Sequence, residues 1–185
     1  MSRTHASVPT LETERLILRP FTAADVPAYA AMNADPDVAR YLGKGSALSA
    51  EDAWRHMAML IGHWQLRGFG MWAVAELERP ELLVGRVGAH QPEGWPEFEI
   101  GWALARSYWG RGYATESASA AMRYAFGVLE RPRVVSLIHK SNTRSRAVAE
   151  RLGERLSGEW ISGERRADIY EIDRETWSSV ANRAR

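Results

Sequence analysis

Eight residues in the second half of the chain read Trp109-Gly110-Arg111-Gly112-Tyr113-Ala114-Thr115-Glu116, and a strand-like run of apolar residues precedes them. A helical pattern follows at once, because apolar side chains recur at the 3.6-residue period from Ala118 to Leu129. Glycines between a strand and a helix allow a tight turn and a close approach to a ligand. Because a helix start presents N–H groups without intrahelical partners, the stretch predicts a site for phosphate or pyrophosphate.

Two other phosphate-binding motifs do not fit this loop. A Walker loop requires Gly-Lys followed by Ser or Thr, but Tyr113 and Ala114 follow Gly112 here. A dinucleotide-binding fingerprint requires a third Gly or Ala where Thr115 stands, and an acidic residue about 20 positions later, where arginines stand instead. Arg111 adds a fixed positive charge to the loop. An alternative in which the glycines serve only the turn stays open at this point.

Outward from the loop, the sequence predicts a mostly antiparallel sheet. Strand-like runs cover 15–19, 71–77, 82–89 and 98–104, and the short connections among the last three indicate a meander. Helices are expected to begin at Thr22 and at Ser49, the second with an apolar face of Trp54, Met57, Ile61 and Trp64.

The C-terminal part adds a fifth strand at 134–138, a helix that Asn142 caps and Gly153 ends, and two strands around 156–162 and 167–173. A helix connects the fourth strand, 98–104, to the fifth, so these two strands are expected to be parallel. The prediction is an α+β, or three-layer α/β, fold.

Length and composition limit the class of protein. The 185 residues fit a single domain, which we place at 11–178 with 1–10 and 179–185 as flexible termini. The net charge of +1 favours neither nucleic acid nor an anionic membrane as a partner. The chain has no cysteine, which excludes disulfides, thiolate metal sites and a cysteine nucleophile. Without a signal-peptide pattern or a membrane-length apolar run, a cytoplasmic protein is expected.

The glycine loop resembles motif A of the GNAT acetyltransferases, Gln/Arg-x-x-Gly-x-Gly/Ala, although Ser107 replaces the long polar residue. The sequence of the loop, Trp-Gly-x-Gly-Tyr-Ala-Thr-Glu, is similar to that of the branch that acetylates the N-terminal alanine or serine of ribosomal proteins. Four further segments resemble that branch in the same order, namely 13–20, 34–38, 99–102 and 142–153. Glu154 departs from the pattern, since relatives usually carry an aromatic residue after the glycine.

This resemblance implies a GNAT fold whose sheet is splayed at the parallel pair of its fourth and fifth strands. Acetyl-CoA, the acetyl donor, would lie in that opening, and no metal is implied. Its pantetheine would pair with backbone near Leu104 and Ala105, and its pyrophosphate would bind loop amides. One of Arg106, Arg144 and Arg146 would meet the 3′-phosphate. The implied cofactor-binding residues are Leu104, Ala105, Trp109, Gly110, Arg111, Gly112, Tyr113, Ala114, Thr115, Asn142 and Arg146.

Without cysteine, the natural chemistry is direct attack of an amine on the bound thioester, with a base for the amine and an acid for the thiolate. Many relatives carry the acid as a tyrosine seven residues after the asparagine, where this chain has Ala149, so Ser145 is the candidate. The candidate base is Glu159, with Glu99 in reserve. His90, Trp95 and Trp160 are candidates for substrate binding. The alternatives, a surface serine and solvated glutamates, stay open.

The sequence therefore predicts an N-acetyltransferase that acts on a primary amine, either a protein N-terminus or a small molecule, in a ternary complex. The alternative is a catalytically idle module that binds acyl-CoA. A metal site at His56 and His63 lacks further ligands at useful spacing. The identity of the acceptor and the oligomeric state, a homodimer included, stay open.

Overall fold

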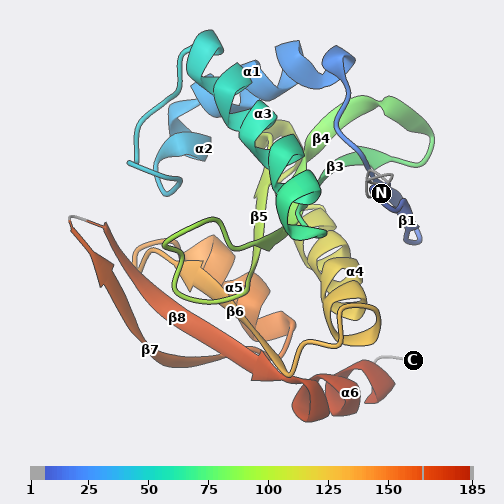
Figure 1. The fold of residues 1–185 in the computed structure, drawn as a ribbon, viewed down its shortest axis with the longest axis vertical. Coiled ribbons are helices and arrows are strands. Elements are labelled where there is room, and N and C mark those ends of the chain that lie inside the picture. The colour runs from blue at the N-terminus through green and yellow to red at the C-terminus, as the bar shows by residue number, and fades with distance from the viewer. Residues whose placement is uncertain (1–6, 164, 184–185) are drawn as a thin grey trace, which may run out of the picture.

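A computed structural model describes residues 7–163 and 165–183. Within that part of the chain, one sheet has the strand order β1-β2-β3-β4-β5-β6-β8-β7 (Figure 1). All neighbouring strands are antiparallel except β5 and β6, which confirms the predicted mixed sheet with a parallel pair. The strands are β1 (Leu11–Glu12), β2 (Leu16–Arg19), β3 (Met71–Glu76), β4 (Arg79–His90), β5 (Glu99–Leu104), β6 (Arg133–Ile138), β7 (Arg155–Ser162) and β8 (Arg165–Asp173).

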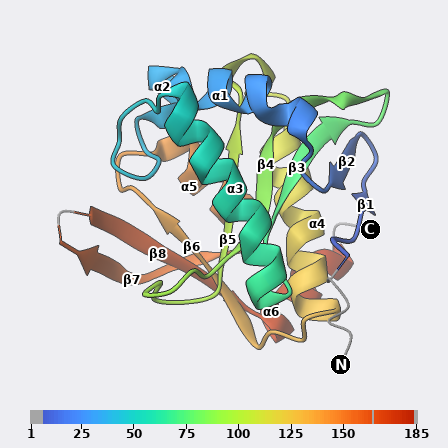
Figure 2. The same ribbon diagram turned by 45° about the horizontal axis from the view of Figure 1, so that its top comes forward.

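Helices cover both faces of the sheet, and the hairpin of β7 and β8 extends away from them (Figure 2). The side chains of β3 alternate between two cores, as a strand buried on both faces requires. Met71 and Ala73 pack with α1 and α3, whereas Trp72 and Val74 pack with α4. The helices are α1 (Val26–Ala34), α2 (Pro36–Ala39), α3 (Ala50–Arg67), α4 (Tyr113–Gly127), α5 (Thr143–Arg151) and α6 (Arg174–Arg183).

Both predicted helix starts in the N-terminal half are present. The Asp25 carboxylate accepts a hydrogen bond from the Thr22 backbone N–H at 2.8 Å and forms a buried ion pair with Arg19 at 2.7 Å. Ser49 caps α3 by accepting from the backbone N–H of Asp52 at 3.0 Å. The connection from β2 into the first helix is therefore fixed by charge-assisted hydrogen bonds.

The predicted apolar face of α3 is only half right. Met57 and Trp64 are buried, but Trp54 is 56% exposed and Ile61 is 40% exposed. Helix α3 buries Ala53 and Leu60 in their place. The stripe of 53, 57, 60 and 64 follows the 3.6-residue period closely, and 54 and 61 lie one position to its side.

The parallel strands β5 and β6 are paired over only a short length before they diverge. In β5 and β6 the register pairs only Glu99 with Val135, and the Val135 N–H donates to the Phe98 carbonyl at 3.1 Å. One step further, the Ser136 hydroxyl donates to the Ile100 carbonyl at 2.8 Å. A side chain thus occupies the carbonyl that the next ladder bond would use, and the strands part beyond it.

Glu154, the residue that departs from the family pattern, lies behind this point. Its side chain is buried, and its Oε1 lies 2.9 Å from the Ser136 hydroxyl. Burial raises the pKa of Glu154 well above its ordinary value, which favours the neutral form of this carboxyl. Glu154 therefore takes the place of an aromatic side chain by supporting Ser136 where the sheet opens.

The structure adds elements that the sequence analysis did not anticipate: β1, α2 and α6. Helix α6 buries Trp177 against Phe126 of α4, with ring centroids 5.9 Å apart. The predicted boundary of the domain at 178 falls inside this helix. Of the termini that we expected to be flexible, residues 1–6, 184 and 185 lie outside the described residues. Among the described residues, no helix is long and apolar enough to cross a membrane.

Candidate functional site

The glycine loop leads directly into the start of α4. Gly110 and Gly112 have φ angles of +77° and +81°, a region that L-residues with side chains rarely adopt. The first helical hydrogen bond runs from the Glu116 N–H to the Gly112 carbonyl at 3.0 Å. The N–H groups of Tyr113, Ala114 and Thr115 therefore have no intrahelical acceptor and are available to an anion.

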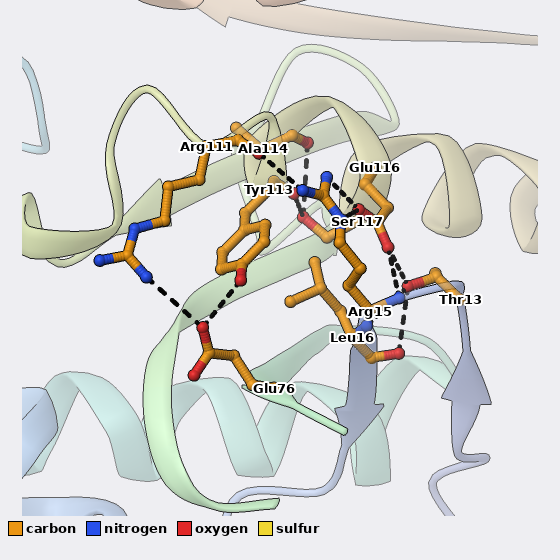
Figure 3. Close-up of polar contacts among 9 residues, drawn as sticks. All are labelled: Thr13, Arg15, Leu16, Glu76, Arg111, Tyr113, Ala114, Glu116 and Ser117. Atoms are coloured by element: carbon orange, nitrogen blue, oxygen red, sulfur yellow. Dashed lines mark hydrogen bonds and ion pairs between the residues drawn. The ribbon is translucent and has the colours of Figure 1, made fainter. Parts of the chain in front are cut away.

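Glu116 fastens this loop to the N-terminal strands, as Figure 3 shows. Its carboxylate accepts from the Thr13 hydroxyl at 2.6 Å and from the Arg15 backbone N–H at 2.9 Å. The Arg15 guanidinium forms an ion pair with Glu116 at 2.6 Å and donates to the Arg111 carbonyl at 3.0 Å. The segment 13–20 and the glycine loop, about a hundred residues apart in the sequence, are thus held in contact by these bonds.

Arg111 is less free than the sequence analysis assumed. Its guanidinium lies 3.6 Å from the Glu76 carboxylate, which also accepts from the Tyr113 hydroxyl at 2.7 Å (Figure 3). Part of the positive charge of Arg111 is therefore neutralised inside the protein. The backbone amides of the helix start are the main anion donors of the loop.

Of the three arginines considered for the 3′-phosphate, two are engaged elsewhere. Arg106 pairs with Asp35 at 2.9 Å, and Arg146 donates to the Tyr170 hydroxyl at 2.9 Å. Arg144 instead lies over the ring of Trp109, 3.7 Å from its centroid. Of these three arginines, Arg144 is the one that contacts the loop, at Trp109.

The backbone of β5 that faces the opening can be read from its hydrogen bonds. The Ala105 N–H donates to the Val84 carbonyl on β4. Backbone N–H and C=O groups alternate in direction along a strand, so those of the even-numbered residues of β5 point toward β6. Among these, the Leu104 carbonyl accepts from the Trp109 indole at 2.9 Å. The Ala105 N–H is thus used within the sheet, whereas Trp102 and Leu104 present their N–H groups to the opening.

A cleft of about 1060 Å³ on the α1 and α3 side of the sheet brings together the predicted chemical groups from distant parts of the chain. It runs from the loop after α2, across β4 and β5, to the hairpin of β7 and β8. The predicted site residues that line it are His90, Trp95, Glu99, Asn142, Ser145, Glu159 and Trp160.

The two candidate bases have different environments. Glu99 is only 9% exposed and accepts from the Trp95 indole at 2.7 Å, whereas Glu159 is exposed. Burial raises the pKa of Glu99 to about 7, against the opposing hydrogen bond from Trp95. A carboxylate with that pKa exchanges protons near neutral pH, so Glu99 suits the role of base better than Glu159.

Asn142 and Ser145 lie together at the start of α5. The Asn142 side chain accepts from the Ser145 backbone N–H at 3.2 Å, which caps the helix as predicted. Both side chains also line the cleft, and Ser145 is half-buried there. The cap therefore holds the Ser145 hydroxyl at the wall of the opening, across from β5.

The aromatic candidates form a continuous group beside Glu99. The ring centroids of His90 and Trp95 are 4.9 Å apart, and those of Trp95 and Trp160 are 5.3 Å apart. Burial, followed by the nearby Arg86, lowers the pKa of His90 to about 3, so this imidazole is neutral. The group forms an apolar wall for an acceptor rather than a second base.

The other two histidines of this region have structural partners. His56 hydrogen-bonds the Tyr29 hydroxyl at 2.7 Å, and His63 contacts the Phe69 carbonyl at 2.7 Å. Within the described part of the chain, no three or more His, Asp or Glu side chains gather in a group able to hold a metal ion.

Comparison with known proteins gives a family model described as an acetyltransferase (GNAT) domain, which matches residues 15–155. An uncharacterized N-acetyltransferase of Bacillus subtilis, YoaA, is 28% identical over 151 residues, which cover 81% of this chain and 85% of that protein.

Solved structures agree with this match. An acetyltransferase from Agrobacterium tumefaciens is 34% identical, with a TM-score of 0.81 over 93% of this chain and 98% of its own. RimL, a ribosomal-protein α-N-acetyltransferase solved with coenzyme A, is 21% identical, with a TM-score of 0.75 over 91% of this chain and 99% of its own. At 21% identity, this comparison shows that the two proteins share a fold.

Proposed function

Since this chain belongs to the GNAT acetyltransferase family and is an acetyl-CoA-dependent N-acetyltransferase, we propose that the acceptor amine attacks the bound thioester directly, with Glu99 as its base. Glu99 takes a proton from the ammonium form of the acceptor and passes it to solvent. The amine nitrogen then bonds to the carbonyl carbon and gives its second proton to Glu99 as the carbon–sulfur bond breaks, which leaves a neutral amide. The Ser145 hydroxyl protonates the departing thiolate and regains a proton from solvent.

The observation that carries this proposal is the burial of Glu99 at the only register pair between β5 and β6. A carboxylate there faces the cleft immediately before the strands part. Asn142 and Ser145 line the same cleft. The amine and the thioester would therefore meet between two groups with complementary roles.

The loop and the strand edge support a matching placement of acetyl-CoA. The pyrophosphate would accept hydrogen bonds from the amides at the start of α4. Pantetheine would pair with the N–H groups of Trp102 and Leu104, as an added strand would. Arg144 would meet a phosphate group beside Trp109. The thioester would then lie near Ser145.

Steady release of CoA thiol from acetyl-CoA, measured with a panel of small amines and N-terminal peptides, tests the activity. Thiol release that requires one class of amine, with an acetylated product seen by mass spectrometry, is the expected result. Tight binding of acetyl-CoA without transfer to any amine in the panel would instead support the alternative, an idle acyl-CoA-binding module.

Ser145→Ala is expected to lower turnover about 100-fold, the low end for a general acid, because water in the cleft can also protonate the thiolate. The affinity for acetyl-CoA should hardly change, since the helix cap uses the backbone N–H of this residue. Initial rates and calorimetric titration separate the two effects. Ser141→Ala, at an exposed position before the same helix, is the control. Wild-type turnover in Ser145→Ala would contradict the role of acid.

A further inference from the structure

One face of the two central strands lines the cleft beside Glu99. The register pairs Arg86 with Ala103, Gly88 with Gly101 and His90 with Glu99, so these residues share one face of β4 and β5. The two glycines contribute no side chain of their own between Arg86 and Glu99, and the Met71 side chain of β3 lies over Gly101. A Cβ at Gly101 would lie 3.2 Å from Met71 Cε and 3.4 Å from Glu99 Oε1, so a larger residue there would crowd both side chains.

Arg86 lines the cleft without a carboxylate partner. Among the residues whose side chains the structure describes, no acidic group lies within ion-pairing distance of it. One Nη nitrogen contacts the thioether of Met71 at 3.8 Å, and the Tyr29 hydroxyl is in hydrogen-bonding reach. Its Nε is buried and has no acceptor among the described residues. The Arg86 guanidinium, which offers five N–H donors, thus has few acceptors around it.

Glu99 is not the missing counter-ion. Its carboxylate accepts a hydrogen bond from the Trp95 indole at 2.7 Å, and no ion pair joins it to Arg86. Burial raises the pKa of Glu99 to about 7, and the charge of Arg86 opposes this increase only in part. The neighbouring histidines are neutral, since burial and then Arg86 lower the pKa values of His56 to about 4 and of His90 to about 3.

A half-buried cation without a partner is costly unless a ligand supplies the opposite charge. We infer that Arg86 binds a carboxylate of the acceptor, so that the acceptor is an amino acid or a similar small molecule with an amine and a carboxylate close together. This inference rests on the proposed function, because it places the amine at Glu99. It adds the acceptor class, and it disfavours a peptide N-terminus, whose α-carboxyl is an amide.

The charge of the whole cleft agrees with an anionic acceptor. Among the residues that the structure describes, three acidic side chains line the cleft, Glu99, Glu159 and Asp168. Against them stand six basic ones, namely Arg40, Lys44, Arg86, Lys140, Arg165 and Arg166. Such a surplus of positive charge raises the local concentration of anions and speeds their association.

Binding of products tests the inference without requiring turnover. The probes are the N-acetyl derivatives of the common amino acids and the primary amides of the same compounds, titrated by calorimetry into CoA-saturated protein. The wild-type protein should bind at least one N-acetyl amino acid about 10- to 100-fold more tightly than its amide. Arg86→Gln should reduce that preference below about threefold, and Arg86→Lys should keep part of it, because it keeps the charge but loses the forked geometry.

Arg165→Gln, which removes an exposed cation from the rim of the cleft, is the matched control and should change the preference less than about twofold. The inference is overturned if no acetylated amino acid binds, if acids and amides bind equally, or if the preference survives Arg86→Gln. A preference that depends on Arg86, in a protein that transfers acetyl to no amine, would uphold the carboxylate site and refute the proposed chemistry.

Discussion

Gly112→Asp should weaken the binding of acetyl-CoA by about 100- to 1000-fold. Gly112 has a φ of +81°, where a residue with a side chain costs about 1–2 kcal/mol. The added carboxylate would also face the pyrophosphate and accept the same helix-start N–H groups, since Gly112 stands at the N-cap of α4. Repulsion and competition together should cost at least as much again.

Gly112→Ala separates the two causes, because it introduces the backbone strain without the charge and should weaken binding only about 10-fold. Among the described residues, a Cβ at this position would approach only the Arg15 Nη2 atom, at 3.3 Å, so both variants should fold with a small shift of that side chain. Calorimetric titration gives the affinity, and thermal unfolding verifies the fold. Wild-type affinity in a folded Gly112→Asp protein would mean that the phosphates bind elsewhere.

Glu99→Gln should lower turnover at pH 7 by about 1000-fold, within the range for loss of a general base. The substitution keeps the size of the side chain and an oxygen able to accept from Trp95. Burial raises the pKa of Glu99 to about 7, so the active, deprotonated form is lost as the pH falls below that value. The wild-type rate should therefore rise with pH through about 7.

The variant should lack that rise, and its deficit should shrink at higher pH as the amine, with an α-amine pKa near 8, loses its proton unaided. Rates from pH 6 to pH 9 at saturating acetyl-CoA give both profiles. Glu159→Gln is the control, because this exposed carboxylate lines the same cleft and should change the rate less than about threefold. The opposite ranking of the two variants would restore Glu159 as the base.

Local rules explain why the sequence predicted most of the fold. The strands of the meander and helix α4 follow from periodicity, and the caps at Ser49 and Asn142 use residues adjacent in the chain. The glycine loop was predictable for the same reason, because a left-handed φ at Gly112 is a local demand.

Contacts between distant segments were beyond such rules. The bond of Glu116 to Thr13 joins residues 103 positions apart, and its only sequence signal was that both belong to segments that resemble one family. The ranking of Glu99 over Glu159 depends on burial, which a single glutamate in a strand does not reveal. The pairing of Glu154 with Ser136 likewise requires the three-dimensional arrangement of β6 and α5.

A crystal structure of the protein with bound CoA tests the central claim, that the opening between β5 and β6 holds the cofactor. The pyrophosphate should lie on the amides of Tyr113, Ala114 and Thr115, and pantetheine should run along Trp102 and Leu104. The sulfur should end near Ser145, on the side of the opening that faces Glu99. CoA bound with Asn142 more than about 8 Å from every ligand atom, too far even for a bridging water, would contradict the account.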